Sequence, residues 1–139
     1  MSGDVRSPED MLAEVDLFSG LSRRQVKKLF DHGRTVPHES GKQVSSEGLG
    51  ALAFHLIIDG RATVSVAGTE VRTLGSGDYF GEISMIDGKP RSATVTAVEP
   101  MTTLAIPHQD FERLLADEPD FARGLLVNLC ARVREAEAR

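Results

Sequence analysis

The feature that most limits the fold of this chain is a series of short apolar segments, separated by glycines, between residues 34 and 106. Residues 62–66 alternate apolar and polar side chains, which is the period of a strand with one buried face. Residues 54–58 are mostly apolar and end at Asp59-Gly60, a pair typical of a turn. Strands this short, with glycine between them, indicate a β-sandwich or a β-barrel.

Helical patterns lie on both sides of this region. Apolar residues recur at helical spacing between residues 8 and 18, and Ser22 with Gln25 forms a capping-box signature for a second helix. A ladder of apolar residues at i, i+4 spacing follows near the C-terminus and consists of Phe121, Leu125, Leu129 and Val133. We expect this stripe to cover the sheets in part. The remainder either packs within the chain or contacts a second copy of the same helix.

The length of 139 residues suits one domain with a real core. We therefore expect a single domain over residues 1–139, divided into N-terminal helices at 8–33, sheets at 34–106 and C-terminal helices at 108–138.

Composition narrows the function classes. With 40% hydrophobic and 27% charged residues, the chain resembles an ordinary globular protein. It has no apolar run near the ~20 residues that span a bilayer, and its N-terminus lacks a secretory apolar region. Its one cysteine, Cys130, fits a reducing cytoplasm. The net charge of −5 argues against nucleic acid as a partner. We expect a cytoplasmic protein that binds neither nucleic acid nor membrane.

One stretch, residues 80–95 (FGEISMIDGKPRSATV), carries the chemistry of a binding site. Gly81 lacks a Cβ and lets the backbone approach a ligand, and Arg91 has a planar set of donors that suits two phosphate oxygens. Glu82 is an acceptor suited to a hydroxyl group. An anion site beside a hydroxyl acceptor indicates a sugar phosphate or nucleotide. The alternative is an ordinary turn, in which Glu82 and Arg91 only form an ion pair.

This stretch resembles the phosphate-binding cassette of cyclic nucleotide-binding domains, with Met85 in place of the usual leucine. The phrase at residues 17–22 (LFSGLS) also resembles the entry motif of that family, and the resemblance extends from about Leu12 to Val133. It implies a mainly β fold with flanking helices. The expected architecture is a double-stranded β-helix (jelly roll) with N-terminal helices and a C-terminal helical lid.

The resemblance also assigns roles to residues. It implies that Arg91 pairs with an oxygen of the cyclic phosphate, that Glu82 accepts the ribose 2′-hydroxyl, and that backbone N–H groups complete the phosphate site. The implied ligand contacts in the cassette are Phe80, Gly81, Glu82, Ile83, Ser84, Arg91, Ser92 and Ala93. Those on the strands are Val64, Val71 and Leu74, and the implied lid residues are Arg132, Val133, Ala136 and Glu137.

A threonine directly after the cassette arginine often accompanies a preference for cGMP in this family, and this chain has Ser92 there. The resemblance therefore predicts cAMP in preference to cGMP as the ligand, with no cofactor. It also predicts a regulatory sensor that acts through movement of the C-terminal helix. We expect the regulatory signal to pass through a homodimer or to an effector protein in trans, since no helix-turn-helix, kinase or channel segment is present. The alternative is a ligand-free interaction module on the same fold.

An enzyme is not expected. The four histidines, His32, His38, His55 and His108, are scattered and match no metal-binding spacing. A metal-binding cupin is also a jelly roll, but it needs clustered histidines. The sequence departs from the family at residues 49–53 (LGALA), which are apolar where polar residues are usual, and this indicates either a flexible loop or an exposed contact surface.

Overall fold

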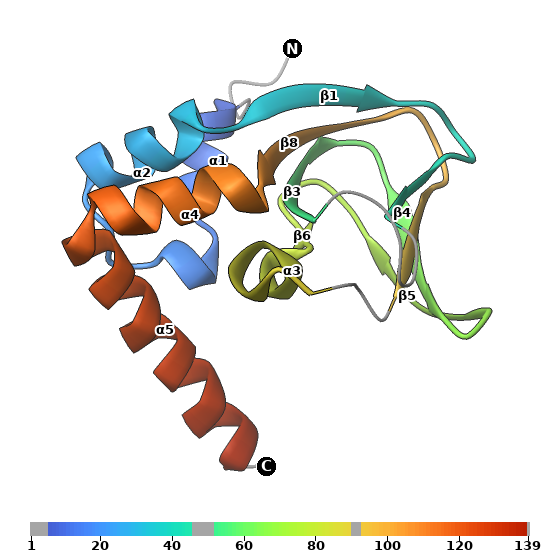
Figure 1. Cartoon of the computed structure of the whole chain (residues 1–139). Helices are drawn as coiled ribbons and strands as arrows, with labels where there is room; N and C mark the ends of the chain where they lie inside the picture. The colour runs from blue at the N-terminus through green and yellow to red at the C-terminus, as the bar shows by residue number, and fades with distance from the viewer. Residues whose placement is uncertain (1–5, 46–51, 90–92, 139) are drawn as a thin grey trace.

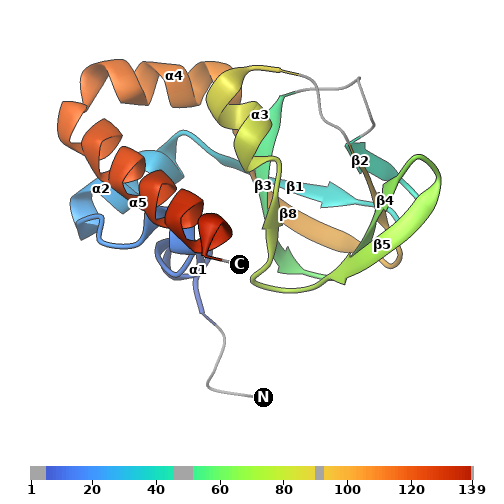
Figure 2. The ribbon, with the colours of Figure 1, turned by 90° about the horizontal axis from the view of Figure 1, so that it is seen from below.

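The computed structural model describes residues 6–45, 52–89 and 93–138 and contains two four-stranded antiparallel sheets with helices near both ends of the chain (Figures 1 and 2). The first sheet has the order β1-β8-β3-β6 and the second has the order β2-β7-β4-β5. The strands are β1 (Arg34–His38), β2 (Gln43–Ser45), β3 (Ala53–Asp59), β4 (Ala62–Val66), β5 (Thr69–Leu74), β6 (Tyr79–Phe80), β7 (Thr94–Ala97) and β8 (Met101–Pro107). This arrangement confirms the expected jelly roll with flanking helices.

The two sheets face each other across an apolar core. β3 pairs with β8 on one side and with β6 on the other, and its first five residues are buried. On β4 the predicted alternation holds at Ala62 and Val64, which are buried, whereas Val66 at the strand end is exposed. The buried side chains of this core are Ile57, Ala62, Val64, Leu74, Phe80, Val95, Ala97 and Met101.

A second apolar core joins the helices to the first sheet. The helices are α1 (Pro8–Ala13), the 3-10 helix η1 (Asp16–Phe18), α2 (Arg23–Asp31), α3 (Glu82–Asp87), α4 (His108–Asp117) and α5 (Pro119–Glu137). The capping box predicted at Ser22 and Gln25 is present at the start of α2. Leu12, Phe111 and Phe121 are fully buried in this core. Helices α1, α2 and α4 gather at one end of the sheets, and α5 extends away from them (Figure 1).

The short helix α3 is fixed at both ends. Gly81 and Gly88 cap it with left-handed backbone conformations at φ 85° and 70°, which side chains other than glycine adopt with strain. At Gly88, a Cβ atom would also lie 2.8 Å from Nε2 of His108. The Nδ1 atom of His108 in turn donates to the Met85 carbonyl oxygen at 2.5 Å. The cassette helix is therefore positioned by α4 as well as by the sheets.

A β-bulge changes which residues of β5 face the inside of the roll. Ser65 pairs with Glu70 and Val64 pairs with Arg72, so the register skips Val71. Directly opposite residues of an antiparallel pair point to the same face. Because Val64 is buried between the sheets, Arg72 shares the inner face with it.

Candidate functional site

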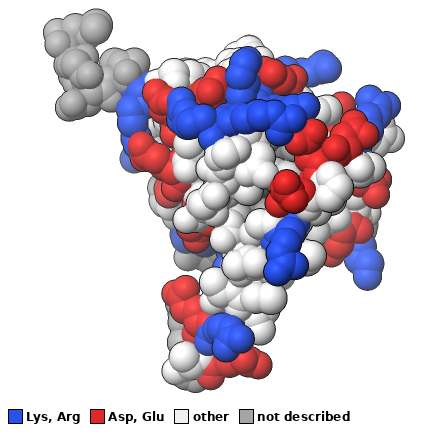
Figure 3. Space-filling view, turned by 90° about the vertical axis from the view of Figure 1, so that its left-hand side faces the viewer, with Lys and Arg blue, Asp and Glu red and all other residues white. Residues whose placement is uncertain are grey.

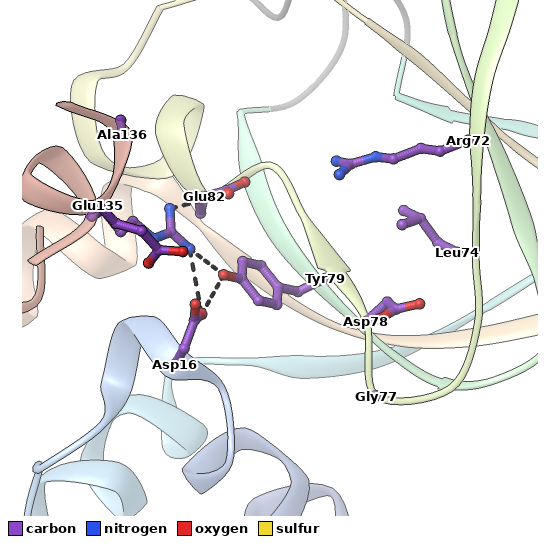
Figure 4. Close-up of a pocket in the computed structure, with 10 residues that line it drawn as sticks. Asp16, Arg72, Leu74, Gly77, Asp78, Tyr79, Glu82, Glu135 and Ala136 are labelled. Atoms are coloured by element: carbon purple, nitrogen blue, oxygen red, sulfur yellow. Dashed lines mark hydrogen bonds and ion pairs between the residues drawn. The ribbon is translucent and has the colours of Figure 1, made fainter. Parts of the chain in front are cut away.

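A cavity of about 440 Å³ lies between the roll and helix α5 (Figure 4). We call its two sides the roll wall and the helix wall. The roll wall consists of Arg72, Leu74, Gly77, Asp78, Tyr79 and Glu82. The helix wall consists of Asp16, Arg132, Glu135 and Ala136. Figure 4 shows Arg72 and Leu74 on one side of the cavity and Glu135 and Ala136 on the other, with Tyr79 and Glu82 between them.

Four of the residues predicted for the site line this cavity, namely Leu74, Glu82, Arg132 and Ala136. Glu82 is the first residue of α3, directly after the buried Gly81. Four more predicted residues, Val64, Phe80, Ser84 and Ala93, are buried or half-buried close to the cassette or between the sheets.

The other predicted residues lie elsewhere. Val71, Ile83 and Val133 are 56%, 66% and 57% exposed and do not line the cavity. Arg91 and Ser92 lie outside the described residues. The assignment of the phosphate to them therefore stays a prediction from the sequence.

Arg132 connects the two walls. Its Nη1 atom lies 3.4 Å from Oε2 of Glu82, and its Nη2 atom lies 3.4 Å from Oδ1 of Asp16. The same guanidinium donates to the hydroxyl oxygen of Tyr79 and lies 5.7 Å from the centre of the tyrosine ring. The Tyr79 hydroxyl donates to Oδ1 of Asp16 at 2.5 Å. One side chain of α5 thus contacts residues of η1, β6 and α3.

The hydrogen bond between Tyr79 and Asp16 changes the pKa values of both groups. It is the main cause that lowers the pKa of the Asp16 carboxyl, with a further contribution from the charge of Arg132. Burial raises the pKa of the Tyr79 phenol well above its ordinary value, and the same hydrogen bond raises it further. Near neutral pH, Asp16 is therefore a charged acceptor and Tyr79 a neutral donor.

A buried polar cluster lies behind the cassette. The Thr103 hydroxyl is 2.9 Å from Nε2 of His38 and 3.0 Å from Nδ1 of His55. The ring of His55 stacks on Phe80 with a centroid distance of 4.9 Å and an interplanar angle of 12°. Burial lowers the pKa of His38, and the charge of Lys42 lowers it further. His55 thus supports Phe80, the residue that precedes Gly81, and His38 packs edge-on against His55.

The described residues contain no group of three or more His, Cys, Asp or Glu side chains that could hold a metal ion. Within the same residues, no helix combines the length and apolar character needed to cross a membrane.

Known proteins resemble this chain in both sequence and structure. The family model named cyclic nucleotide-binding domain matches residues 36–118. A cAMP-dependent protein kinase regulatory subunit from Eremothecium gossypii is 40% identical over 108 residues, which are 77% of this chain. The chain spans 24% of that relative's length.

Two solved structures are similar over most of the chain. The N-terminal domain of a transcriptional regulator from Streptomyces coelicolor has a TM-score of 0.84 at 25% identity. The similarity covers 93% of this chain and 94% of that domain. The catabolite activator protein of Thermus thermophilus has a TM-score of 0.71 at 29% identity, over 89% of this chain and 61% of its own. Together with the family match over residues 36–118, these findings show that the chain belongs to the cyclic nucleotide-binding domain family.

Proposed function

We propose that this domain binds a cyclic nucleotide in the cavity between the roll wall and the helix wall, without a cofactor and without catalysis of its own. The observation that carries the proposal is the position of Glu82, whose side chain lines a cavity of about 440 Å³ next to Gly81. Ligand pockets commonly have volumes of roughly 300–1,000 Å³. Carboxylate oxygens accept hydrogen bonds from hydroxyl groups, so Glu82 is suited to a ribose.

The phosphate site in this proposal is Arg91 together with Ser92, as the cassette sequence implies. A guanidinium donates two parallel hydrogen bonds to a phosphate. Leu74 and the half-buried Tyr79 offer apolar surface to the remainder of the nucleotide. Among the described residues, the cavity lining has more carboxylates than guanidinium groups, and this supports the assignment of a further cation, Arg91, to the phosphate.

We further propose that cAMP is preferred over cGMP. Two findings support the preference for cAMP. The first is the serine at position 92, and the second is that the relative from Eremothecium gossypii is named as a regulatory subunit of a cAMP-dependent protein kinase. The single cysteine supports a reducing, cytoplasmic setting.

We propose that the output is a movement of α5, transmitted to a second copy or to an effector protein in trans. Beyond Leu125, the apolar side chains of Leu126, Val127 and Val133 are 62%, 59% and 57% exposed. Figure 3 shows the corresponding pale stripe on the projecting helix, with charged side chains at its edges. Such a surface supports contact with another protein.

Calorimetric titration of the wild-type chain with cAMP and with cGMP tests the proposal. We expect binding of both nucleotides, with cAMP tighter. The Arg91→Ala variant should bind about ten- to several hundred-fold more weakly, because a phosphate charge loses its main partner. Lys89→Ala is the matched control, since Lys89 is an exposed cation two residues away. Unchanged affinity in the Arg91 variant would show that the phosphate lies elsewhere.

Thermal melting separates a binding domain from a ligand-free interaction module. A ligand that binds only the folded state raises the stability by RT ln(1 + [L]/Kd). We expect a rise in Tm with cAMP. No shift with either nucleotide at about millimolar concentration, where a Kd near 1 mM already gives a measurable change, would favour the interaction module.

A further inference from the structure

We propose that Arg132 competes with the ligand's ribose hydroxyl for Glu82, and that Asp16 is a positioning residue that holds Arg132 away from Glu82. This inference rests on the proposed function and deepens it, because it names the two residues that set the affinity of the ribose site. Competition makes Arg132 an internal inhibitor of binding, rather than a lid residue that strengthens it.

The geometry of Arg132 supports an exchange between two positions. Its contacts with Glu82 and with Asp16 are both 3.4 Å long. A well-formed ion pair between a guanidinium and a carboxylate has N···O distances near roughly 2.8 Å. Neither contact is at its optimum, so the guanidinium is shared between the two carboxylates. A small rotation of the side chain strengthens one contact as it weakens the other.

The two carboxylates differ in their exposure to water. The side chain of Glu82 is 22% exposed and that of Asp16 is 72% exposed. Solvent screens the exposed pair more strongly, and this favours the contact of Arg132 with Glu82 in the absence of ligand. The Tyr79 hydroxyl contributes to the other position, because it accepts from Arg132 and donates to Asp16.

A ribose hydroxyl at Glu82 meets a carboxylate whose Oε2 atom already accepts from Arg132 and whose negative charge Arg132 partly neutralises, so the carboxylate is a weaker acceptor while the contact lasts. If Arg132 pairs with Glu82 for most of the time, the apparent Kd rises by the inverse of the free fraction. When the hydroxyl binds, Arg132 moves fully to Asp16 and Tyr79. Ligand binding at α3 therefore changes a contact of α5 without any change in the apolar cores.

Asp16 and Arg132 both lie outside residues 36–118, the part of the chain that the family model matches. The match covers residues 36–118 and includes Tyr79 and Glu82, whereas Asp16 and Arg132 precede and follow it. The pair thus comes from the helices that flank the matched residues.

The first test compares cAMP with 2′-deoxy-cAMP, which lacks the hydroxyl, by calorimetric titration of the Arg132→Gln variant. The ratio of the two affinities isolates the hydroxyl, because loss of a positive charge affects both anions alike. We expect Arg132→Gln to raise this ratio in favour of cAMP by about threefold to tenfold. Arg134→Gln is the control, since it removes the same charge from an exposed position on α5 that does not line the cavity. An unchanged or lower ratio overturns the proposal.

The second test uses the opposite sign expected at Asp16. Asp16→Asn removes the charge that draws Arg132 away, so the ratio should fall by about twofold to fivefold. Asp117→Asn, at an exposed position of α4, is the control. In a chain that already carries Glu82→Gln, the added Arg132→Gln substitution should no longer alter the ratio of the cAMP and 2′-deoxy-cAMP affinities. Equal signs at positions 16 and 132, or a persistent effect without Glu82, overturn the competition. Absence of nucleotide binding to the wild-type chain overturns the proposed function itself and this inference with it.

Discussion

The roll wall of the cavity is backed by buried apolar side chains, whereas the helix wall is held mainly by polar contacts. Leu74 on the roll wall is 6% exposed and belongs to the core between the sheets. On α5, the side-chain amide of Asn128 donates to the Leu17 and Ser19 carbonyl oxygens at 2.7 and 2.8 Å, one turn before Arg132. Apolar packing is dense and tolerates little displacement, whereas exposed polar contacts are readily exchanged.

The two ends of α5 show the same difference. Phe121 and Leu125 near its start are 0% and 3% exposed, and Leu126 and Val133 are more than half exposed. The start of the helix is therefore fixed in the core, and its end can change contacts without exposing that core. The comparison indicates that the roll wall determines which ligand fits and that the helix wall responds to it.

The largest effect is expected on the roll wall. Leu74→Ala leaves a cavity in the core between the sheets, and we expect a loss of about 2–5 kcal/mol in the free energy of unfolding. Urea denaturation measures it. Thr73→Ala is the matched control on the same strand, because Thr73 is exposed and its loss should cost less than about 1 kcal/mol. Equal losses would mean that the inner face of β5 is not part of a packed core.

A smaller effect is expected on the helix wall. Asn128→Ala removes two hydrogen bonds between α5 and the η1 region, so we expect a loss of about 1–2 kcal/mol, partly offset by the helix propensity of alanine. Val127→Ala, at an exposed neighbouring position, is the control. A loss as large as that of Leu74→Ala would contradict the contrast between the walls.

Arg72 should influence the choice of base. Its guanidinium lines the cavity and makes no ion pair among the residues that the structure describes. Guanine presents two acceptors, O6 and N7, to an arginine, whereas adenine presents N7 beside an amino donor. We expect Arg72→Gln to weaken cGMP binding by about threefold to tenfold and cAMP binding less. Titration of both nucleotides measures this, and an equal loss for both would show that Arg72 does not contact the base.

Most of the roll could be predicted from the sequence, because apolar alternation and glycine turns are local signals. Leu74 is one such residue. Val71 is predicted for the site but does not line the cavity. The bulge skips Val71 in the strand register and places Arg72 on the inner face instead. One extra residue in a strand reverses the face of its neighbours, and no local pattern marks it here.

The helix wall was harder to predict. Arg132 and Ala136 are four residues apart and share a face of α5, and both line the cavity. Val133 is rotated away from them by one residue and lies on the exposed face, although the resemblance implies all three as lid residues. Asp16 was missed because it contacts Arg132 across 116 residues of sequence, and only the folded structure brings them together.

The pH dependence of stability should also differ between the walls. The buried His38 supports the roll, and its lowered pKa means that the unfolded chain binds a proton more readily below the ordinary value of 6.5. Stability is therefore expected to fall as the pH decreases below 6.5. The lowered pKa of Asp16 stabilises the fold above 3.8, and this contribution is lost only at lower pH, as the carboxyl protonates. Urea denaturation between pH 8 and 5 should show the first effect, and a His38→Asn variant should show a smaller slope. An unchanged slope would mean that His38 does not titrate on unfolding.

The smallest effect is expected at the exposed end of α5. Val133→Ser changes a side chain that is 57% exposed and lies outside the cavity, so the free energy of unfolding should change by less than about 0.5 kcal/mol beyond the difference in helix propensity. Nucleotide affinity should stay within about twofold, because the side chain touches neither wall. Sedimentation at several concentrations adds the informative measurement. If α5 contacts a second copy through its apolar stripe, this substitution should weaken self-association while it leaves nucleotide binding unchanged. A loss of nucleotide affinity instead would place Val133 in a closed lid, and would mean that the end of α5 rotates when the ligand binds.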